Sequence, residues 1–345
     1  MTLETLETMP LLRDTLRPGP AVDLHGRNCL TIGLVNNMPD AACEATERQF
    51  LKLLRAASSD VVGLLKLFSI AAVPRSEAAR ADLAGRYRDL AELWSAPLDG
   101  LIVTGTEPVA ADLKDEPYWN ALCDLVDWAC TNTISAVWSC LAAHAGVLYA
   151  DGIVRERLAG KLSGVFDCET AGAHPLLAGM APLLRVPHSR LNDVPEAGLR
   201  ANGYRVLTRS AAAGVDAFVK EQDGGSLFVF FQGHPEYDVD SLLREYRRDV
   251  GRFLRGERGT YPEAPRNYFG SAATFLADDF RARATGERHG DLIGDFPMQR
   301  LAAGIENTWH PGAVGIYRNW IEYLKDQKRN RRSPAAIERA RRVSA

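Results

Sequence analysis

The stretch SAVWSCLAAHAGVLY, residues 135–149, decides the fold of this chain. It starts as a short apolar run, which is typical of a buried strand, and continues with the period of a helix. Cys140 stands at the junction. A nucleophile on a sharp strand-to-helix turn is exposed at the sheet edge, and the N–H that follows it can bind an oxyanion. A lone cysteine is more often a small buried apolar residue, so a catalytic role needs a partner elsewhere.

The stretch FQGHPEYD, residues 231–238, supplies a partner for this cysteine. His234 can accept the thiol proton as a general base. Glu236 lies two residues on, on the same side of an extended segment, and can hold the imidazole in one tautomer. A histidine alone is usually a core residue with satisfied hydrogen bonds. A histidine and a glutamate that close an apolar strand, combined with a cysteine at a turn, indicate a catalytic triad.

The segments before Cys140 alternate between strand and helix patterns. This alternation predicts a mostly parallel sheet with helices on both faces, an α/β fold. In such sheets ligands bind beyond the carboxyl ends of the strands, where Asn36, Gly105 and Cys140 all lie. The expected strands are 29–35, 61–70, 99–106 and 134–138, and the expected helices are 44–54, 76–94 and 117–130.

The segments after Cys140 are less regular. Residues 152–187 read as irregular and rich in loops, and residues 255–300 give no clear pattern. Strands are expected at 204–208, 215–221 and 226–231, and helices after Asp240 and at 309–324. The predicted organisation is an N-terminal arm (1–27), a main domain (28–255), a C-terminal helical extension packed on it (256–325) and a basic tail expected to be disordered (326–345).

The bulk properties exclude several classes of protein. A chain of 345 residues can bury a large core, and its net charge of −3 gives no electrostatic footprint for nucleic acid. No apolar run approaches the length of a membrane span, and the N-terminus lacks the apolar core of a signal peptide. Six cysteines without CxxC spacing argue against a zinc site or a disulfide framework. We therefore expect a cytoplasmic protein with no metal, no nucleic acid and no membrane partner.

A set of short motifs resembles the homoserine O-succinyltransferase family. They are NNMP (36–39), ERQFL (47–51), WSC (138–140), KLSGVF (161–166), PHSR (187–190), GHPEYD (233–238), EYRRD (245–249), NYF (267–269) and NWIEY (319–323). Each motif alone is weak, but the ordered set covers about residues 28–325 and is specific. The resemblance implies a class I glutamine amidotransferase-like fold and acyl transfer by a ping-pong mechanism.

The resemblance also implies the catalytic roles. It identifies Cys140 as the residue that an acyl-CoA acylates, His234 as the general base and Glu236 as the third member of the triad. The acyl-CoA is a co-substrate, either succinyl-CoA or acetyl-CoA, and no permanently bound cofactor is implied.

Binding roles follow from the same resemblance. Lys161 and Ser189 match positions near the acyl donor, and Arg248 matches the arginine that binds the amino acid carboxylate. A guanidinium suits that task because it binds a carboxylate through a bidentate fork. The oxyanion hole would use the N–H of Leu141 and one N–H from the turn at Val35–Asn36.

Departures from the family pattern concern the substrate. Asp40 and Ala41 replace lysines after the Met-Pro pair, and Val109 or Ala110 stands where a glycine accompanies succinyl donors and a glutamate acetyl donors. Since neither residue is a carboxylate, succinyl-CoA is the expected donor, and the family resemblance makes L-homoserine the expected acceptor. Homoserine O-acetylation and serine O-acylation stay open. Alternatives of other classes are a glutamine amidotransferase-like hydrolase and a non-catalytic binding module. The partners are small molecules, and a homodimer is an open possibility.

Overall fold

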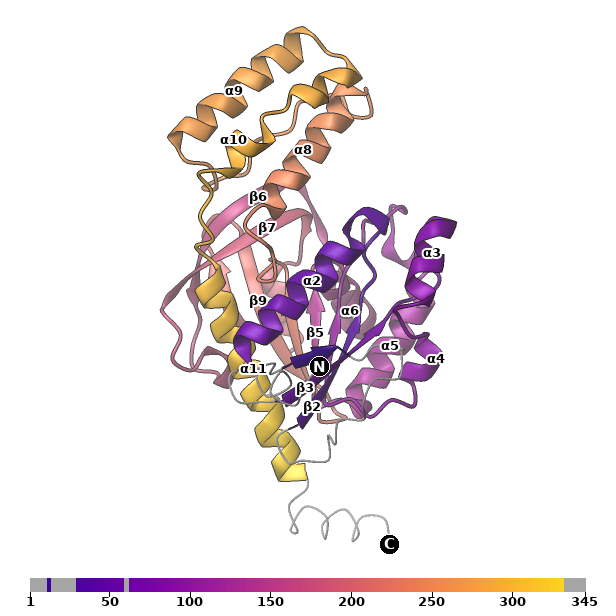
Figure 1. Cartoon of the computed structure of the whole chain (residues 1–345). Helices are drawn as coiled ribbons and strands as arrows, with labels where there is room; N and C mark the ends of the chain where they lie inside the picture. Colours follow the sequence, from indigo (N-terminus) through magenta and orange to yellow (C-terminus); the bar gives the residue numbers. More distant parts are fainter. Residues whose placement is uncertain (1–10, 14–28, 59–61, 332–345) are drawn as a thin grey trace, which may run out of the picture.

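The computed structural model describes residues 11–13, 29–58 and 62–331, which form an α/β fold around one sheet (Figure 1). The sheet has 10 strands in the order β1-β3-β2-β4-β5-β10-β9-β8-β6-β7. The strands are β1 Leu11–Arg13, β2 Cys29–Val35, β3 Val62–Phe68, β4 Gly100–Val103, β5 Ser135–Ser139, β6 Glu156–Thr170, β7 Leu183–Asp193, β8 Arg205–Ser210, β9 Gly214–Glu221 and β10 Leu227–Phe231.

Helices cover both faces of this sheet. The α-helices are α2 Asp40–Ala57, α3 Glu77–Ala84, α4 Leu90–Leu93, α5 Trp119–Asn132, α6 Leu141–Asp151, α7 Glu196–Ala201, α8 Ser241–Leu254, α9 Ser271–Gly286, α10 Met298–Ala302 and α11 His310–Arg331. Short 3-10 helices are η1 Leu113–Asp115, η2 Pro175–Leu177 and η3 Gly290–Asp295. In the described part of the chain, none of the helices is both long and apolar enough to cross a membrane.

The half of the sheet from β1 to β10 is parallel throughout, as predicted. Strand β10 shows why its sequence is a continuous apolar run. Val229 and Phe231 face a core shared with α2 and α11, whereas Phe228 and Phe230 face a second core shared with α5 and α6. Because successive side chains of a strand point to opposite faces, a strand covered on both sides must be apolar at every position.

The half from β10 to β7 is antiparallel, and here the reading of residues 152–187 as loop-rich is wrong. Most of this segment forms the 15-residue strand β6 and the beginning of β7, which pair with each other. The first half of β6 is largely exposed and has no buried face, and its register with β7 shifts between Arg157 and Leu162. Without a buried face the strand leaves no alternating apolar pattern in the sequence.

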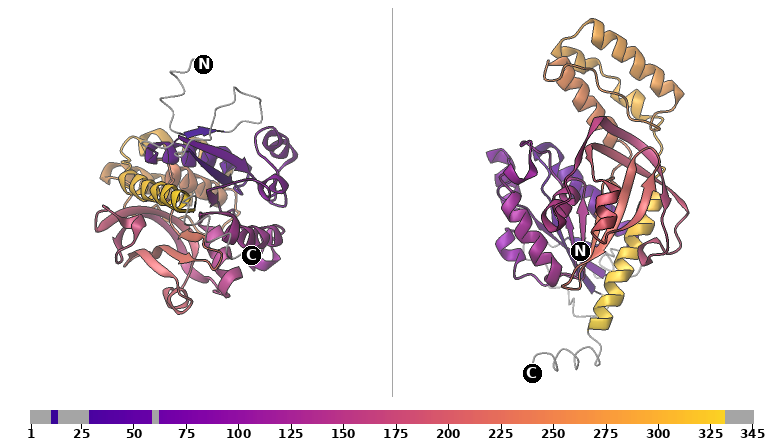
Figure 2. Two further views of the ribbon diagram at one scale, coloured as in Figure 1. Left: turned by 90° about the horizontal axis from the view of Figure 1, so that it is seen from below. Right: turned by 180° about the vertical axis from the view of Figure 1, so that it is seen from behind.

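The C-terminal extension has its own apolar core. Helices α8, α9 and α10 with η3 pack around a cluster that includes Tyr246, Phe280 and Phe296. This unit projects from one end of the sheet, and both views agree on its position (Figures 1 and 2). Residues 255–300, which gave no clear sequence pattern, form much of it.

The chain then returns to the sheet through α11, whose Trp320 donates a hydrogen bond from its indole N–H to Ser135 Oγ at 2.9 Å. Helix α11 continues to Arg331, so the tail predicted from residue 326 begins with helix. Lys328 fixes this end of the helix through an ion pair with Asp99 at 2.6 Å. Residues 332–345 lie outside the described residues, as does the predicted arm apart from 11–13.

Candidate active site

Cys140 occupies a sharp turn between β5 and α6. Its φ of 53° and ψ of −114° lie in a region that residues other than glycine rarely adopt. Holding such a residue costs roughly 1–3 kcal/mol, which packing must offset. The backbone N–H of Cys140 donates to the carbonyl of Phe231 at 2.8 Å, so the turn is tied to the end of β10. The sequence prediction of a nucleophile at a strand-to-helix junction therefore agrees with the backbone geometry.

His234 and Glu236 follow β10 and lie in contact with each other. Nδ1 of His234 is 2.8 Å from Oε1 of Glu236, and both residues are buried. The backbone N–H of His234 donates to the carbonyl of Pro187 at 2.8 Å. The ring of Tyr237 stacks on the imidazole with centroids 4.1 Å apart. The imidazole is thus held by the Glu236 carboxylate and by the Tyr237 ring, and the backbone of His234 is tied to β7.

The charge of His234 depends on Cys140. Burial by itself would lower the pKa of His234. The negative charges of an ionised Cys140 and of Glu236, with hydrogen bonds to both side chains, raise the pKa of His234 well above its usual range. The fold therefore brings Cys140 close enough to His234 to raise the pKa of the imidazole, which favours its imidazolium form.

The predicted oxyanion donors have different outcomes. The N–H of Leu141 begins α6 and has no recorded hydrogen-bond partner among the described residues. The N–H of Asn36 instead donates to the carbonyl of Phe68 at 2.9 Å, so the prediction of a donor there is wrong. The Asn36 side chain holds its own loop, with Nδ2 donating to the carbonyl of Cys43 at 2.9 Å. Because β2 is an interior strand, the parallel ladder uses the N–H at its end.

Gly105 lies against the start of α6. A Cβ added at Gly105 would stand 2.8 Å from the backbone N of Leu141, closer than real Cβ atoms approach. The loop after β4 therefore packs against the start of α6, near the nucleophile. This close approach makes the Gly105–Thr106 backbone the neighbour of the Leu141 N–H, in place of the turn at Asn36.

A second cluster gathers around Glu245 of α8. Lys161 of β6 lies 3.0 Å from Glu245 and 2.8 Å from Asp249. Ser189 of β7 donates its hydroxyl to Glu245. Arg248 is more exposed and lies 3.9 Å from Glu245 and 3.5 Å from Asp249. The structure thus brings together Lys161, Ser189 and Arg248, which the sequence had singled out on three separate segments.

Sequence reasoning missed the residues that join the two clusters. Tyr237 stacks on His234 and donates its hydroxyl to Glu245 at 2.5 Å. Burial alone would raise the pKa of Glu245, but the charge of Lys161 and the two hydroxyl donors lower it to about 2. Glu245 is therefore an anion in the folded protein. Both residues lie inside motifs noted above, GHPEYD and EYRRD, yet nothing in those letters shows that they touch.

Behind the catalytic histidine lies a further buried carboxylate, Asp216 of β9. It accepts hydrogen bonds from Thr208 Oγ1 at 2.7 Å and from the N–H of Gly233 at 3.2 Å. Its neighbour His188 is fully buried in β7, 3.4 Å from Asp216. Burial, above all, lowers the pKa of His188 well below its usual range, which leaves this ring neutral.

Comparison with known proteins gives one family. The model of the homoserine O-succinyltransferase family matches residues 21–331. A homoserine O-succinyltransferase of Rhodopseudomonas palustris is 50% identical over 95% of this chain and 100% of its own length. The enzyme of the same name from Methylorubrum extorquens is 48% identical over 86% of this chain and 88% of its own length.

Solved structures that match this chain are more distant in sequence. A glutamine amidotransferase from Methylobacillus flagellatus is 17% identical with a TM-score of 0.48, over 86% of this chain and 95% of its own. A glutamine amidotransferase from Thermotoga maritima is 12% identical with a TM-score of 0.44, over 88% of this chain and 100% of its own.

Proposed function

We propose that this chain, which belongs to the homoserine O-succinyltransferase family, transfers a succinyl group from succinyl-CoA to the hydroxyl of L-homoserine. The observation that carries the proposal is the contact between Cys140 and the His234–Glu236 pair at the carboxyl ends of β5 and β10. A thiolate beside an imidazolium is the reactive form that attack on a thioester needs. The names of the relatives support the choice of donor and acceptor.

In the first half of the reaction, the Cys140 sulfur attacks the thioester carbonyl. The tetrahedral oxyanion accepts hydrogen bonds from the N–H of Leu141 and from the backbone at Gly105–Thr106, next to it. The carbon–sulfur bond to CoA then breaks, and His234 gives its proton to the departing CoA thiolate. One thioester is exchanged for another, so the step is close to balanced in energy.

In the second half, the acylated cysteine no longer carries a negative charge. That charge is what contributes most to keeping His234 protonated against the effect of burial. Acylation therefore lowers the pKa of His234, and the neutral imidazole can accept the proton of the homoserine hydroxyl. The hydroxyl oxygen attacks the acyl carbon, the ester forms, and the Cys140 thiolate leaves. The same residue serves as acid and as base because its partner changes charge.

The amino acid binds at the second cluster. Arg248 is exposed enough to meet the α-carboxylate, and the carboxylates of Glu245 and Asp249 can accept the α-ammonium group. Lys161 offsets part of their charge, and Ser189 fixes the orientation of Glu245. This arrangement of fixed positive and negative charges matches a zwitterion. Tyr237 places it beside the catalytic histidine.

The test is the intact mass of the protein after incubation with acyl-CoA and no acceptor. Succinyl-CoA is expected to leave a covalent adduct on the wild type and none on Cys140→Ala. Cys130→Ala is the matched control, because Cys130 is also partly exposed and lies outside the site. An adduct with neither succinyl-CoA nor acetyl-CoA would refute the proposal.

The choice among related activities needs a second measurement. Initial rates with succinyl-CoA and acetyl-CoA, each with L-homoserine and L-serine, give four combinations. We expect the succinyl-CoA and homoserine pair to be fastest. Release of ammonia from glutamine without acyl-CoA would instead favour a glutamine amidotransferase-like hydrolase.

A further inference from the structure

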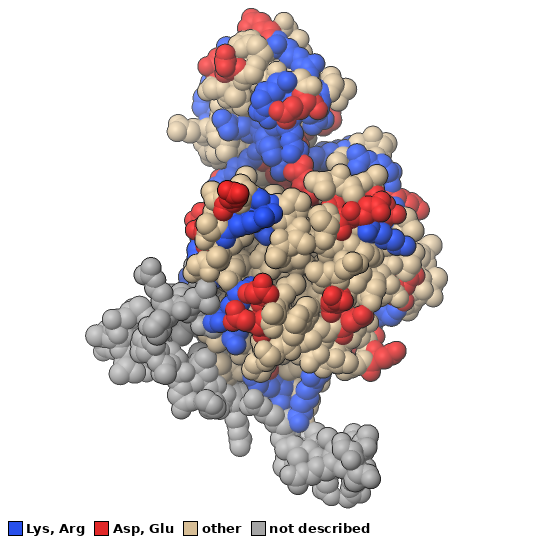
Figure 3. Space-filling model, turned by 90° about the vertical axis from the view of Figure 1, so that its right-hand side faces the viewer, with Lys and Arg blue, Asp and Glu red and all other residues tan. Residues whose placement is uncertain are grey.

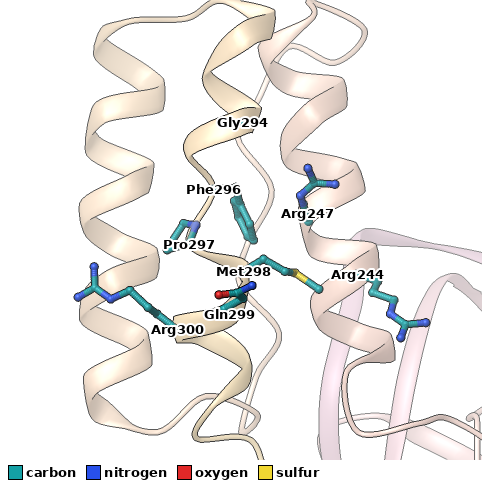
Figure 4. A pocket seen from close by; sticks show the side chains of 8 residues that line it. All are labelled: Arg244, Arg247, Gly294, Phe296, Pro297, Met298, Gln299 and Arg300. Atoms are coloured by element: carbon teal, nitrogen blue, oxygen red, sulfur yellow. The ribbon is translucent and has the colours of Figure 1, made fainter.

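A groove rich in arginine opens on the C-terminal extension, between α8 and the segment that joins η3 to α10. Lys and Arg side chains gather where the extension meets the body of the protein (Figure 3). The groove has a volume of about 500 Å³ (Figure 4). Its lining consists of Arg244, Arg247, Gly294, Phe296, Pro297, Met298, Gln299 and Arg300.

The lining combines positive charge with an apolar floor. No Asp or Glu is among the described lining residues. Phe296 and Met298 project into the space between α8 and α10, and Arg247 lies beside it, whereas the side chains of Arg244 and Arg300 extend outward on its two sides (Figure 4). Arg247 and Arg300 are exposed and have no recorded ion pair within the described ranges, whereas Arg244 pairs with Asp240 at 2.6 Å. The groove therefore carries uncompensated positive charge beside an aromatic and a thioether side chain.

Helix α8 connects this groove to the catalytic centre. Arg244 and Arg247 lie three residues apart and share one side of the helix. Glu245 and Asp249 lie on nearly the opposite side of the helix, where they contact Lys161. A ligand in the groove is thus separated from the Glu245 cluster by the width of a helix, about 10 Å. An extended molecule can occupy both places at once.

We propose that this groove binds the nucleotide end of the acyl donor while its thioester reaches Cys140. The inference rests on the proposed function, which supplies acyl-CoA as the donor. CoA ends in an adenosine that carries a 3′-phosphate and a diphosphate. Guanidinium groups bind phosphate oxygens in bidentate geometry, and an adenine ring packs well against Phe296 and Met298. The flexible pantetheine arm has the extended shape needed to cross the face of α8.

The experiment compares two donors. One is succinyl-CoA, and the other is the succinyl thioester of N-acetylcysteamine, which has the same reacting bond without the nucleotide. The variant Arg247→Ala/Arg300→Ala removes two unpaired charges from two separate elements. We expect its KM for succinyl-CoA to rise about tenfold or more, with kcat unchanged. Its kcat/KM for the short thioester should equal that of the wild type.

Controls separate the possible failures. Arg318→Ala removes one exposed arginine from α11, away from the groove, and should leave both donors unaffected. If the double variant does not fold, the same kinetic comparison of the two donors is made with the single variant Arg247→Gln. Adenosine 3′,5′-bisphosphate should compete with succinyl-CoA in the wild type and much less in the double variant, whereas inorganic phosphate should not compete.

Two results would overturn the inference. Equal losses of kcat/KM with both donors would mean that the arginines act on the reacting centre. An unchanged KM for succinyl-CoA would mean that the nucleotide binds elsewhere. If the wild type used neither donor, the proposed function itself would fail, and that outcome is distinct from either of the others.

Discussion

The two halves of the sheet contribute differently to the site. The parallel half consists of short strands buried on both faces, and it presents Cys140 after β5 and His234 after β10. The antiparallel half has the long, partly exposed strands β6 and β7, which carry Lys161 and Ser189. In the proposed function, the first half supplies the groups that react, and the second half with α8 supplies the groups that bind. Tyr237 and Glu245 join them.

This difference follows from burial. A nucleophile held at an unusual φ needs rigid surroundings, and a strand packed on both faces gives them. A binding cluster must exchange water for substrate, so its side chains lie where the sheet is open to solvent on one side. We therefore expect changes in the parallel half to lower kcat and changes in the binding half to raise KM.

The largest effect on the rate of reaction is expected from Gly105→Ala in the parallel half. The added Cβ would stand 2.8 Å from the backbone N of Leu141 and would push the loop away from the start of α6. Losing a positioned oxyanion donor should lower kcat by roughly 100- to 1,000-fold. Single-turnover acylation of Cys140 measures this directly. Gly304→Ala is the control, because a Cβ there meets nothing within 4 Å. A normal rate of acylation in Gly105→Ala would show that this loop does not form part of the oxyanion hole.

A smaller effect is expected from Arg248→Ala in the binding half. Loss of a bidentate hydrogen bond to the α-carboxylate should raise the KM for the amino acid about tenfold to a hundredfold. The KM for the acyl donor should hardly change. Steady-state kinetics with each substrate varied in turn provides the measurement, and Arg248→Lys tests whether the fork or only the charge matters. Equal rises in both KM values would contradict the carboxylate role.

The last effect is on stability and not on catalysis, and it concerns Asp216, at the boundary between the halves. Burial, against the hydrogen bonds from Thr208 and Gly233 and the charges of Arg190 and His234, raises the pKa of Asp216 to about 6. A carboxyl with a raised pKa keeps its proton longer in the folded than in the unfolded state. The stability it contributes is therefore present at low pH and is lost as pH rises from about 4 to about 6, by up to about 3 kcal/mol.

Asp216→Asn should abolish this part of the pH dependence. Urea unfolding at several pH values from 4 to 7 measures it as the change in the stability difference between variant and wild type. A stability difference that stays constant across this range would contradict the raised pKa.

Local sequence pattern predicted β2 to β5 and β8 to β10, but it missed β1, β6 and the beginning of β7, and it joined α3 and α4 into one helix. Strands such as β5 and β10 are apolar at every position because two cores cover them. Strand β6 has no such cover over its first half, so its sequence resembles a loop. Asn36 lies at a strand end, as predicted. Its backbone N–H, which would have to bind the oxyanion, already donates a hydrogen bond to the carbonyl of Phe68. Hydrogen bonds to neighbouring strands cannot be read from one segment.

The sequence by itself determined the turn at Cys140, the His234–Glu236 pair and the set of binding motifs, because each depends on residues close together in the chain. Only the tertiary structure decided how they meet. It placed Glu245 between Lys161, Ser189 and Tyr237, engaged the N–H of Asn36 with Phe68, brought Gly105 against the start of α6, and turned the arginines of α8 toward a groove. The physical reason is that packing and hydrogen bonding between distant segments set these contacts, and no local pattern records them.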